Sequence, residues 1–220
     1  MIPMSIHNIL WQVNGALFDT YPALTYSFSK ALSEIGFSAA LNVIDGLVRQ
    51  SLDDSVDILS GRFKLDPQLL RQKFIESYRS ISPASQRPFP GVQSIGEFIQ
   101  RNGGANLALT DTGVEFASRL LEAHQFSGWI ADTLFMKIGD ENQNDPSMLR
   151  AVLDRYSLNP GETLLITALG LDVQAGRTAG IRTCLYGKAE TNLAPDLQIE
   201  KYSQLLDLLG GRRAVTDKGG

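Results

Sequence analysis

The sequence has few of the residues that mark secreted or nucleic-acid-binding proteins. It contains one cysteine, Cys184, so no disulfide can form within the chain, which fits a reducing compartment. Cys184 lies in a strand-like run with no histidine nearby, and we expect it to be a buried structural thiol. The two histidines, His7 and His124, stand far apart in the sequence, and we expect each to be structural or to face solvent.

The chain also lacks an excess of positive charge and a long apolar run. Its 20 Lys and Arg are outnumbered by 24 Asp and Glu and are scattered, so there is no basic stripe for a phosphate backbone. No segment approaches the roughly 18 apolar residues that span a bilayer, and no apolar segment follows a basic N-terminus. We therefore expect no nucleic-acid partner, no membrane partner and a cytoplasmic location.

What the chain does have is a globular composition, 43% hydrophobic, and enough length for a core domain with a smaller insert. Residues 8–13 form an apolar run of strand length that ends in a polar turn. From Pro22 to about Ser80 the apolar residues recur at helical spacing, in three stretches between residues 26–35, 43–59 and 69–78. This region is predicted to be an all-helical insert.

Helix and strand patterns alternate in the second part of the chain. Pro83, Pro88 and the pair Pro90-Gly91 predict a linker, because they break helices. Strands are predicted at residues 105–109, 129–134, 163–167 and 182–186, and helices at 92–100, 115–124, 146–156, 173–179 and 202–209. Strands separated by single helices indicate right-handed crossovers and a parallel sheet. We predict a doubly wound, Rossmann-like α/β core at residues 1–20 and 86–210, a helical cap at 21–85 and a flexible tail at 211–220.

Ligands of such sheets bind beyond the carboxyl ends of the strands, so the residues after each strand are the candidates for a site. After the first strand comes Gln12-Val13-Asn14-Gly15-Ala16-Leu17-Phe18-Asp19-Thr20. The second motif is a strand ending in Thr110, and the third is Gln143-Asn144-Asp145-Pro146 before a helix. The fourth is Thr167-Ala168-Leu169-Gly170-Leu171-Asp172, followed by Ala179-Gly180-Ile181.

In this order, and with a cap after the first strand, the motifs resemble the haloacid dehalogenase-like (HAD) hydrolase superfamily. The resemblance covers residues 9–209 and is strongest to its phosphoglycolate phosphatase-like and β-phosphoglucomutase-like branch. It implies that Gln12 stands where the family has its aspartate nucleophile and Asn14 where it has its aspartate acid/base. It also implies that Thr110 matches the residue that binds the phosphoryl group.

The resemblance places Gln143 at the family's lysine position, and Ala168 and Asp172 at its two metal-binding aspartates. Only Asp172 keeps the family's residue among these three. An amide can neither attack phosphorus nor protonate a leaving group at neutral pH, and magnesium requires anionic oxygen ligands. We therefore expect no cofactor and no metal, and no catalytic residue among Gln12, Asn14, Gln143 and Ala168.

The sequence supports two hypotheses for function. In the first, the chain is a non-catalytic HAD-like protein that binds a ligand or a partner. Its predicted ligand-binding residues lie between core and cap and suit a neutral or weakly anionic small molecule: Gln12, Asn14, Thr110, Gln143 and Asp172. A cleft filled by its own side chains would instead favour a protein partner. The oligomeric state is not indicated.

The alternative is a HAD-family hydrolase, a phosphatase that acts on a small phosphorylated metabolite with Mg²⁺. It requires Asp19 or Asp172 to take a new role, with Asp19 as a displaced nucleophile. Lys137, six residues before Gln143, would then replace the missing lysine from another direction.

Overall fold

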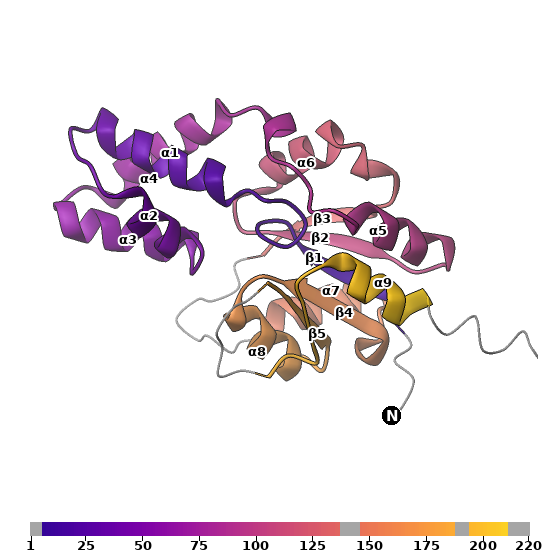
Figure 1. Ribbon diagram of the computed structural model, residues 1–220. Helices are drawn as coiled ribbons and strands as arrows, with labels where there is room; N and C mark the ends of the chain where they lie inside the picture. The colour runs from indigo at the N-terminus through magenta and orange to yellow at the C-terminus, as the bar shows by residue number, and fades with distance from the viewer. Residues whose placement is uncertain (1–5, 137–145, 188–193, 211–220) are drawn as a thin grey trace, which may run out of the picture.

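The computed structural model describes residues 6–136, 146–187 and 194–210. In this part of the chain a parallel sheet is covered by helices on both faces, and a block of helices is inserted after the first strand (Figure 1). The predicted fold class, a doubly wound α/β core with a helical insertion, is confirmed.

The sheet has the strand order β3-β2-β1-β4-β5-β6, and all its neighbouring strands are parallel. The first strand, β1, is central: Gln12 pairs with Leu109 of β2, and Trp11 with Ile166 of β4. The carboxyl ends of three adjacent strands therefore meet at one place. The strands are β1 (Asn8–Gln12), β2 (Asn106–Thr110), β3 (Asp132–Phe135), β4 (Thr163–Thr167), β5 (Arg182–Tyr186) and β6 (Leu197–Ile199).

Alternation along the strands builds an apolar core on each face of the sheet. In β1, Ile9 and Trp11 contribute to one core and Leu10 to the other, and all three are fully buried. The first face is covered by α5 (Val92–Arg101), α6 (Val114–Ala123) and α9 (Tyr202–Gly210). The second is covered by α7 (Ser147–Arg155) and α8 (Gly170–Thr178).

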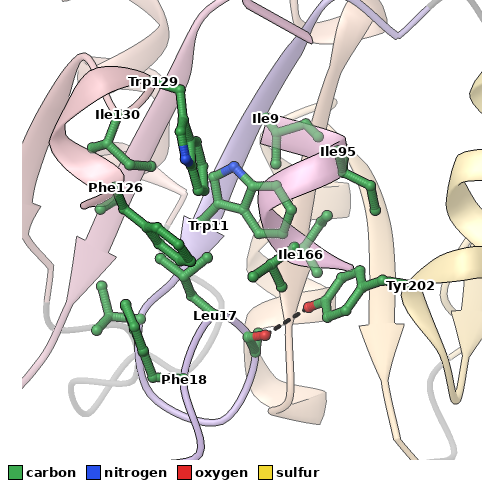
Figure 2. Packing of buried hydrophobic residues seen from close by; sticks show 14 of the residues in the cluster. Ile9, Trp11, Leu17, Phe18, Ile95, Phe126, Trp129, Ile130, Ile166 and Tyr202 are labelled. Atoms are coloured by element: carbon green, nitrogen blue, oxygen red, sulfur yellow. Dashed lines mark hydrogen bonds between the residues drawn. The ribbon is translucent and has the colours of Figure 1, made fainter. Parts of the chain in front are cut away.

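Aromatic side chains fill the first core around Trp11 (Figure 2). The Trp11 indole packs edge-on against Trp129 with ring centroids 6.0 Å apart, and its Nε1 donates to Asn106 Oδ1 at 2.9 Å. Tyr202 lies on its other side at 5.8 Å and donates its hydroxyl to the Ala16 carbonyl at 2.7 Å (Figure 2). The loop after β1 is thereby fixed to the core.

The inserted block consists of α1 (Tyr21–Glu34), α2 (Leu41–Val48), α3 (Leu52–Phe63) and α4 (Pro67–Arg79), which lie together beside the sheet (Figure 1). Its helices bury an apolar cluster of their own, and Phe28 and Phe74 stack at its centre with ring centroids 4.2 Å apart. One side chain of the core, Phe116 of α6, packs against this cluster. Short 3₁₀ helices lie at Pro83–Ser85, Phe126–Gly128 and Pro160–Glu162.

The structure corrects three details of the sequence interpretation. The helical stretch at 43–59 is two helices, because Ser51 adopts an extended conformation and its hydroxyl caps α3 by accepting from the Asp54 N–H. Trp129 precedes β3 and belongs to the core around Trp11, so the strand begins at Asp132. The strand β6 was not predicted, since it has only three residues.

Several expectations concern single residues and segments. Cys184 is fully buried, as expected, and burial raises the pKa of its thiol to about 12. His7 is exposed, and His124 packs on Phe18 at a ring distance of 5.3 Å. The predicted tail at 211–220 lies outside the described residues. No helix in the described part of the chain is long and apolar enough to cross a membrane.

Candidate active site

The side chain of Gln12 is held in an internal hydrogen-bond network at the end of β1. Its Oε1 accepts from the Thr167 hydroxyl at 2.8 Å and from the Ala168 N–H at 2.9 Å. Both lone pairs of this oxygen are therefore used by residues at the end of β4. The side chain is buried, with 7% of its surface exposed. The position that the resemblance assigns to a nucleophile thus holds an amide bound within the protein.

The same network determines the protonation state of Asp172, in the first turn of α8. Thr167 Oγ1 lies 2.6 Å from Asp172 Oδ2 and also accepts from the Leu169 N–H at 3.0 Å. Thr167 has a single proton, and Gln12 Oε1 can only accept. All these contacts are satisfied when Asp172 is protonated and donates to Thr167, which then donates to Gln12.

Burial supports this arrangement. Asp172 is fully buried, and its Oδ1 has no hydrogen-bond partner among the residues that the structure describes. Desolvation raises the pKa of its carboxyl to about 7; a hydrogen bond donated by Thr167 to the ionised form lowers this pKa, and the charge of Asp111 raises it. The network of Gln12, Thr167 and Asp172 is accordingly uncharged over the lower part of the neutral range.

Asn14 lies in the loop after β1 and faces a second set of partners. Its Oδ1 accepts from the Thr20 hydroxyl at 2.9 Å, and its Nδ2 donates to Asp111 Oδ1 at 2.5 Å. Burial raises the pKa of Asp111, and the Asn14 hydrogen bond opposes this increase. Asn14 therefore connects the loop before the cap to the loop after β2.

The described residues leave little space between these side chains. Thr110 is buried, and its hydroxyl lies 3.0 Å from that of Thr112. A cavity of about 20 Å³, which we call the inner void, has room for about one water molecule. Its lining consists of Gln12, Leu109, Thr110, Asp111, Met136, Leu169 and Asp172.

These residues do not fit a magnesium ion, which binds oxygen ligands octahedrally and usually keeps several waters. The inner void has no room for a hydrated ion, and both Gln12 Oε1 and Asp172 Oδ2 are hydrogen-bonded to Thr167. Within residues 6–136, 146–187 and 194–210, no group of three or more His, Cys, Asp or Glu side chains is arranged to hold a metal.

A much larger cavity lies between the core and the inserted helices. This outer pocket has a volume of about 550 Å³. Arg49 of the inserted block and Asp19 of the first loop bring opposite charges to it, and the rings of Phe89 and Tyr186, 4.7 Å apart, form an aromatic wall. Its lining consists of Gly15, Asp19, Tyr21, Arg49, Phe89, Ala168, Tyr186 and Gly187.

The structure brings together some of the predicted site residues and separates others. Gln12, Thr110 and Asp172 line the inner void, whereas Ala168 lines the outer pocket. Asn14 is not among the described residues that line either cavity. Its side chain hydrogen-bonds to Asp111 and Thr20 in neighbouring loops. Gln143, Asn144 and Lys137 lie outside the described residues.

Four residues of the site were missed from the sequence. Thr167 and Asp111 each stand beside a predicted residue, at the carboxyl end of β4 and directly after β2, and this position was a usable signal. Tyr21 and Arg49 belong to the inserted helices, and no local pattern shows that they face the sheet.

Comparison with known proteins agrees with the fold and the order of the motifs. Residues 9–186 match the family model described as haloacid dehalogenase-like hydrolase. A phosphoglycolate phosphatase of Vibrio vulnificus (strain YJ016) is 23% identical, and the alignment covers 95% of this chain and 98% of that protein.

Solved structures show the same fold. A predicted phosphoglycolate phosphatase from Haemophilus somnus 129pt superimposes with a TM-score of 0.78 at 16% identity, covering 93% of this chain and 98% of that one. An Asp-to-Asn mutant of CbbY from Rhodobacter sphaeroides, in complex with xylulose-(1,5)bisphosphate, gives a TM-score of 0.73 at 16% identity and covers 91% and 96%. The chain therefore belongs to the haloacid dehalogenase-like hydrolase family.

Proposed function

We propose that this chain is a non-catalytic member of its family that binds a small polar molecule in the outer pocket. The observation that carries the proposal is the internal hydrogen bonding of Gln12, whose amide oxygen is fully used by Thr167 and Ala168. Covalent catalysis needs a free nucleophile and a neighbouring acid, and removal of either from such a unit costs several orders of magnitude in rate. The hydrogen-bonded amide of Gln12 can act neither as the nucleophile nor as the acid.

The outer pocket supports the binding role. Its volume lies within the usual range for small-molecule sites, roughly 300 to 1,000 Å³. The guanidinium of Arg49 lies over the Tyr21 ring at 4.3 Å and pairs with Asp45 at 2.7 Å, so its plane is held in a fixed orientation. Asp45 already offsets the charge of Arg49 and Asp19 adds a carboxylate to the lining, so the pocket disfavours a phosphate dianion and suits a neutral or weakly anionic ligand.

The test of binding is a thermal-shift screen of the full chain with sugars, sugar acids and hydroxy acids. We expect a ligand of this class to raise the melting temperature, and Arg49→Gln to abolish the increase, because the guanidinium lines the pocket. The matched control is Arg62→Gln, at an exposed arginine of α3 outside the lining. An increase that survives Arg49→Gln and is lost in Arg62→Gln would contradict the proposal.

The test of catalysis is an assay of the purified chain with Mg²⁺ on an aryl phosphate, phosphoglycolate and hexose phosphates. We expect no turnover above the protein-free reaction. Turnover that disappears in Asp19→Asn or Asp172→Asn would refute the non-catalytic role.

One observation favours the alternative of a phosphatase. Asp19 is exposed and lies in the lining of the outer pocket together with Arg49, so a carboxylate and a cation face the same space. In this alternative Asp19 is the nucleophile, and Asp19→Asn abolishes the turnover while Gln12→Ala leaves it unchanged.

A further inference from the structure

Two opposite charges face the outer pocket from different parts of the molecule. Asp19 comes from the loop after β1, and Arg49 follows the last residue of α2 in the inserted block. Although both line the same cavity, Arg49 pairs with Asp45 and forms no ion pair with Asp19. The two charges therefore do not satisfy each other.

Arg49 is held so that part of its guanidinium remains open to a ligand. The guanidinium lies over the Tyr21 ring at 4.3 Å, and its Nε donates to Asp45 Oδ2 at 2.7 Å. The Tyr21 ring in turn packs against the turn at Gly15, where an added Cβ would overlap it. Among the described residues, only the Nε of Arg49 has a hydrogen-bond partner. Its two terminal nitrogens keep a fork of N–H donors, which matches the geometry of a carboxylate.

Asp19 is held through its backbone, and its carboxylate is not used. Its N–H donates to the Arg87 carbonyl at 2.9 Å, and the preceding residue, Phe18, forms an antiparallel bridge with Pro88. The side chain is exposed and accepts no hydrogen bond within the part of the chain that the structure describes. A carboxylate in this setting is an acceptor for the N–H groups of an ammonium.

The outer pocket also has an apolar wall. The rings of Phe89 and Tyr186 lie 4.7 Å apart, and Tyr186 stacks on the buried ring of Tyr202 at 4.6 Å, which fixes its plane. Ala168 and Gly187 extend the lining with a methyl group and backbone. One cavity thus combines a carboxylate, a fork of cationic donors and an aromatic surface.

We propose that the ligand of the outer pocket is a zwitterion, a free amino acid. Its carboxylate binds the terminal nitrogens of Arg49, its ammonium binds Asp19, and its carbon chain lies on the wall of Phe89 and Tyr186. A simple anion would leave Asp19 without a partner, and a simple cation would leave Arg49 without one, whereas a zwitterion satisfies both. The inference rests on the proposed function, because it names the ligand class of the same pocket.

Calorimetric titration of the full chain at neutral pH tests the ligand class. The first probe is L-phenylalanine, compared with phenylpropionate, which lacks the ammonium, and phenethylamine, which lacks the carboxylate. The second is γ-aminobutyrate, whose charges are further apart, compared with butyrate and butylamine. We expect at least one zwitterion to bind about tenfold or more tightly than either of its analogues, because each analogue loses one hydrogen-bonded charge pair.

Two variants assign the charges to their partners. Asp19→Asn should weaken the zwitterion about tenfold and abolish its advantage over the analogue without an ammonium, since that contact is already absent. Arg49→Gln should do the same relative to the analogue without a carboxylate. If Arg49→Gln does not give a native circular dichroism spectrum, Arg49→Lys, which keeps the charge but not the planar fork, takes its place and should also weaken the zwitterion.

The matched controls are Asp154→Asn and Arg62→Gln, at exposed residues outside the lining. Both should keep the affinities of the wild type. The ligand class is wrong if an analogue with one charge binds within about threefold of its zwitterion. It is also wrong if Asp19→Asn weakens the zwitterion and the analogue without an ammonium equally.

The outcomes separate this inference from the proposed function. Binding of a sugar or hydroxy acid, with no binding of either zwitterion, would refute the zwitterion and leave the proposed function in place. Phosphatase turnover would refute the non-catalytic role and leave the ligand selectivity unaffected. If no ligand of any class binds, both proposals fail.

Discussion

Among the residues of the site, Asp172 has a carboxyl group whose ionisation inside the protein is unfavourable. It is fully buried, its Oδ2 bonds to Thr167, and in the described part of the chain its Oδ1 has no hydrogen-bond partner. A carboxyl in this environment is more stable as the neutral acid, since the ionised form would lose its hydration. Asp172 therefore links the stability of the fold to pH.

We predict that ionisation of Asp172 destabilises the protein. Its folded-state pKa of about 7 lies above the unfolded value, so its stabilising contribution is present in full below about pH 4 and is lost as the pH rises through 7. Asp172→Asn, whose amide can donate to Thr167 at any pH, should remove this dependence. Urea unfolding at pH 5 and pH 8 should show the wild type losing on the order of a few kcal/mol relative to the variant, at about 1.4 kcal/mol per pKa unit.

The matched control is Asp154→Asn, at an exposed carboxylate of α7. This variant should follow the wild type at both pH values. A difference in unfolding free energy between the wild type and Asp172→Asn that is the same at pH 5 and pH 8 would show that Asp172 does not change its protonation state over this range in the folded protein.

Sequence and structure differ in what they reveal of these residues. Gln12 and Asn14 could be placed from the sequence, because a short apolar strand followed by a glycine turn is a local pattern. Their engagement with Thr167, Asp111 and Thr20 could not, since it depends on side-chain rotamers in three loops. Of the predicted ligand-binding residues that the structure describes, Gln12, Thr110 and Asp172 line a void of about 20 Å³.

At the scale of elements, α5 packs closely on the core through a glycine. A Cβ added at Gly96 would overlap the ring of Trp129, and the Gly96 carbonyl accepts from Asn106 Nδ2 at 2.9 Å. The absence of a side chain lets the helix backbone approach β2 and the tryptophan together. Only a small residue is compatible with this contact.

We predict that Gly96→Ala destabilises the protein by about 1 to 3 kcal/mol, because the added methyl forces the helix or the indole to move. The control is Gly46→Ala in α2, where an added Cβ has no neighbour within 4 Å. There the higher helix propensity of alanine should stabilise the protein by about 0.5 to 1 kcal/mol. Urea unfolding followed by circular dichroism measures both, and a stabilising Gly96→Ala would contradict the packing described.

Elements with strong periodicity were predictable, and those defined by single contacts were not. The strands β1, β2, β4 and β5 are buried apolar runs between turn residues, which is a strong local signal. In contrast, β6 is positioned by Asp196, whose Oδ2 accepts from the Thr183 N–H at 2.8 Å and from its hydroxyl at 2.9 Å. A three-residue strand fixed by one carboxylate leaves no periodicity to detect.

At the scale of the whole molecule, the inserted helices contact the core at α6 as well as at Gly15. The Phe116 ring lies 5.1 Å from that of Tyr78, and Arg79 pairs with Glu115 at 3.3 Å. The ion pair is exposed and contributes little, whereas the ring contact removes apolar surface from water. Phe116 thus gives α4 an apolar contact with the core.

We predict that Phe116→Ala increases the mobility of the inserted block without unfolding the sheet. Hydrogen exchange should become faster in α4 and in residues 80–90, and should be unchanged in β1 and β4. Phe135→Ala is the control, because this phenylalanine of β3 is exposed. Equal acceleration in the strands and in α4 would show that Phe116 supports the whole fold instead.

The placement of the two tryptophans allows fluorescence to distinguish the α/β core from the inserted helices. Trp11 and Trp129 are the chain's only tryptophans, and both belong to the apolar cluster on one face of the sheet. The helices α1 to α4 contain no tryptophan. Intrinsic emission at tryptophan wavelengths therefore reports on the α/β core alone, whereas the helical ellipticity includes the inserted block. Melting curves recorded by tryptophan emission and by helical ellipticity would show which of the two parts unfolds first, without any added label.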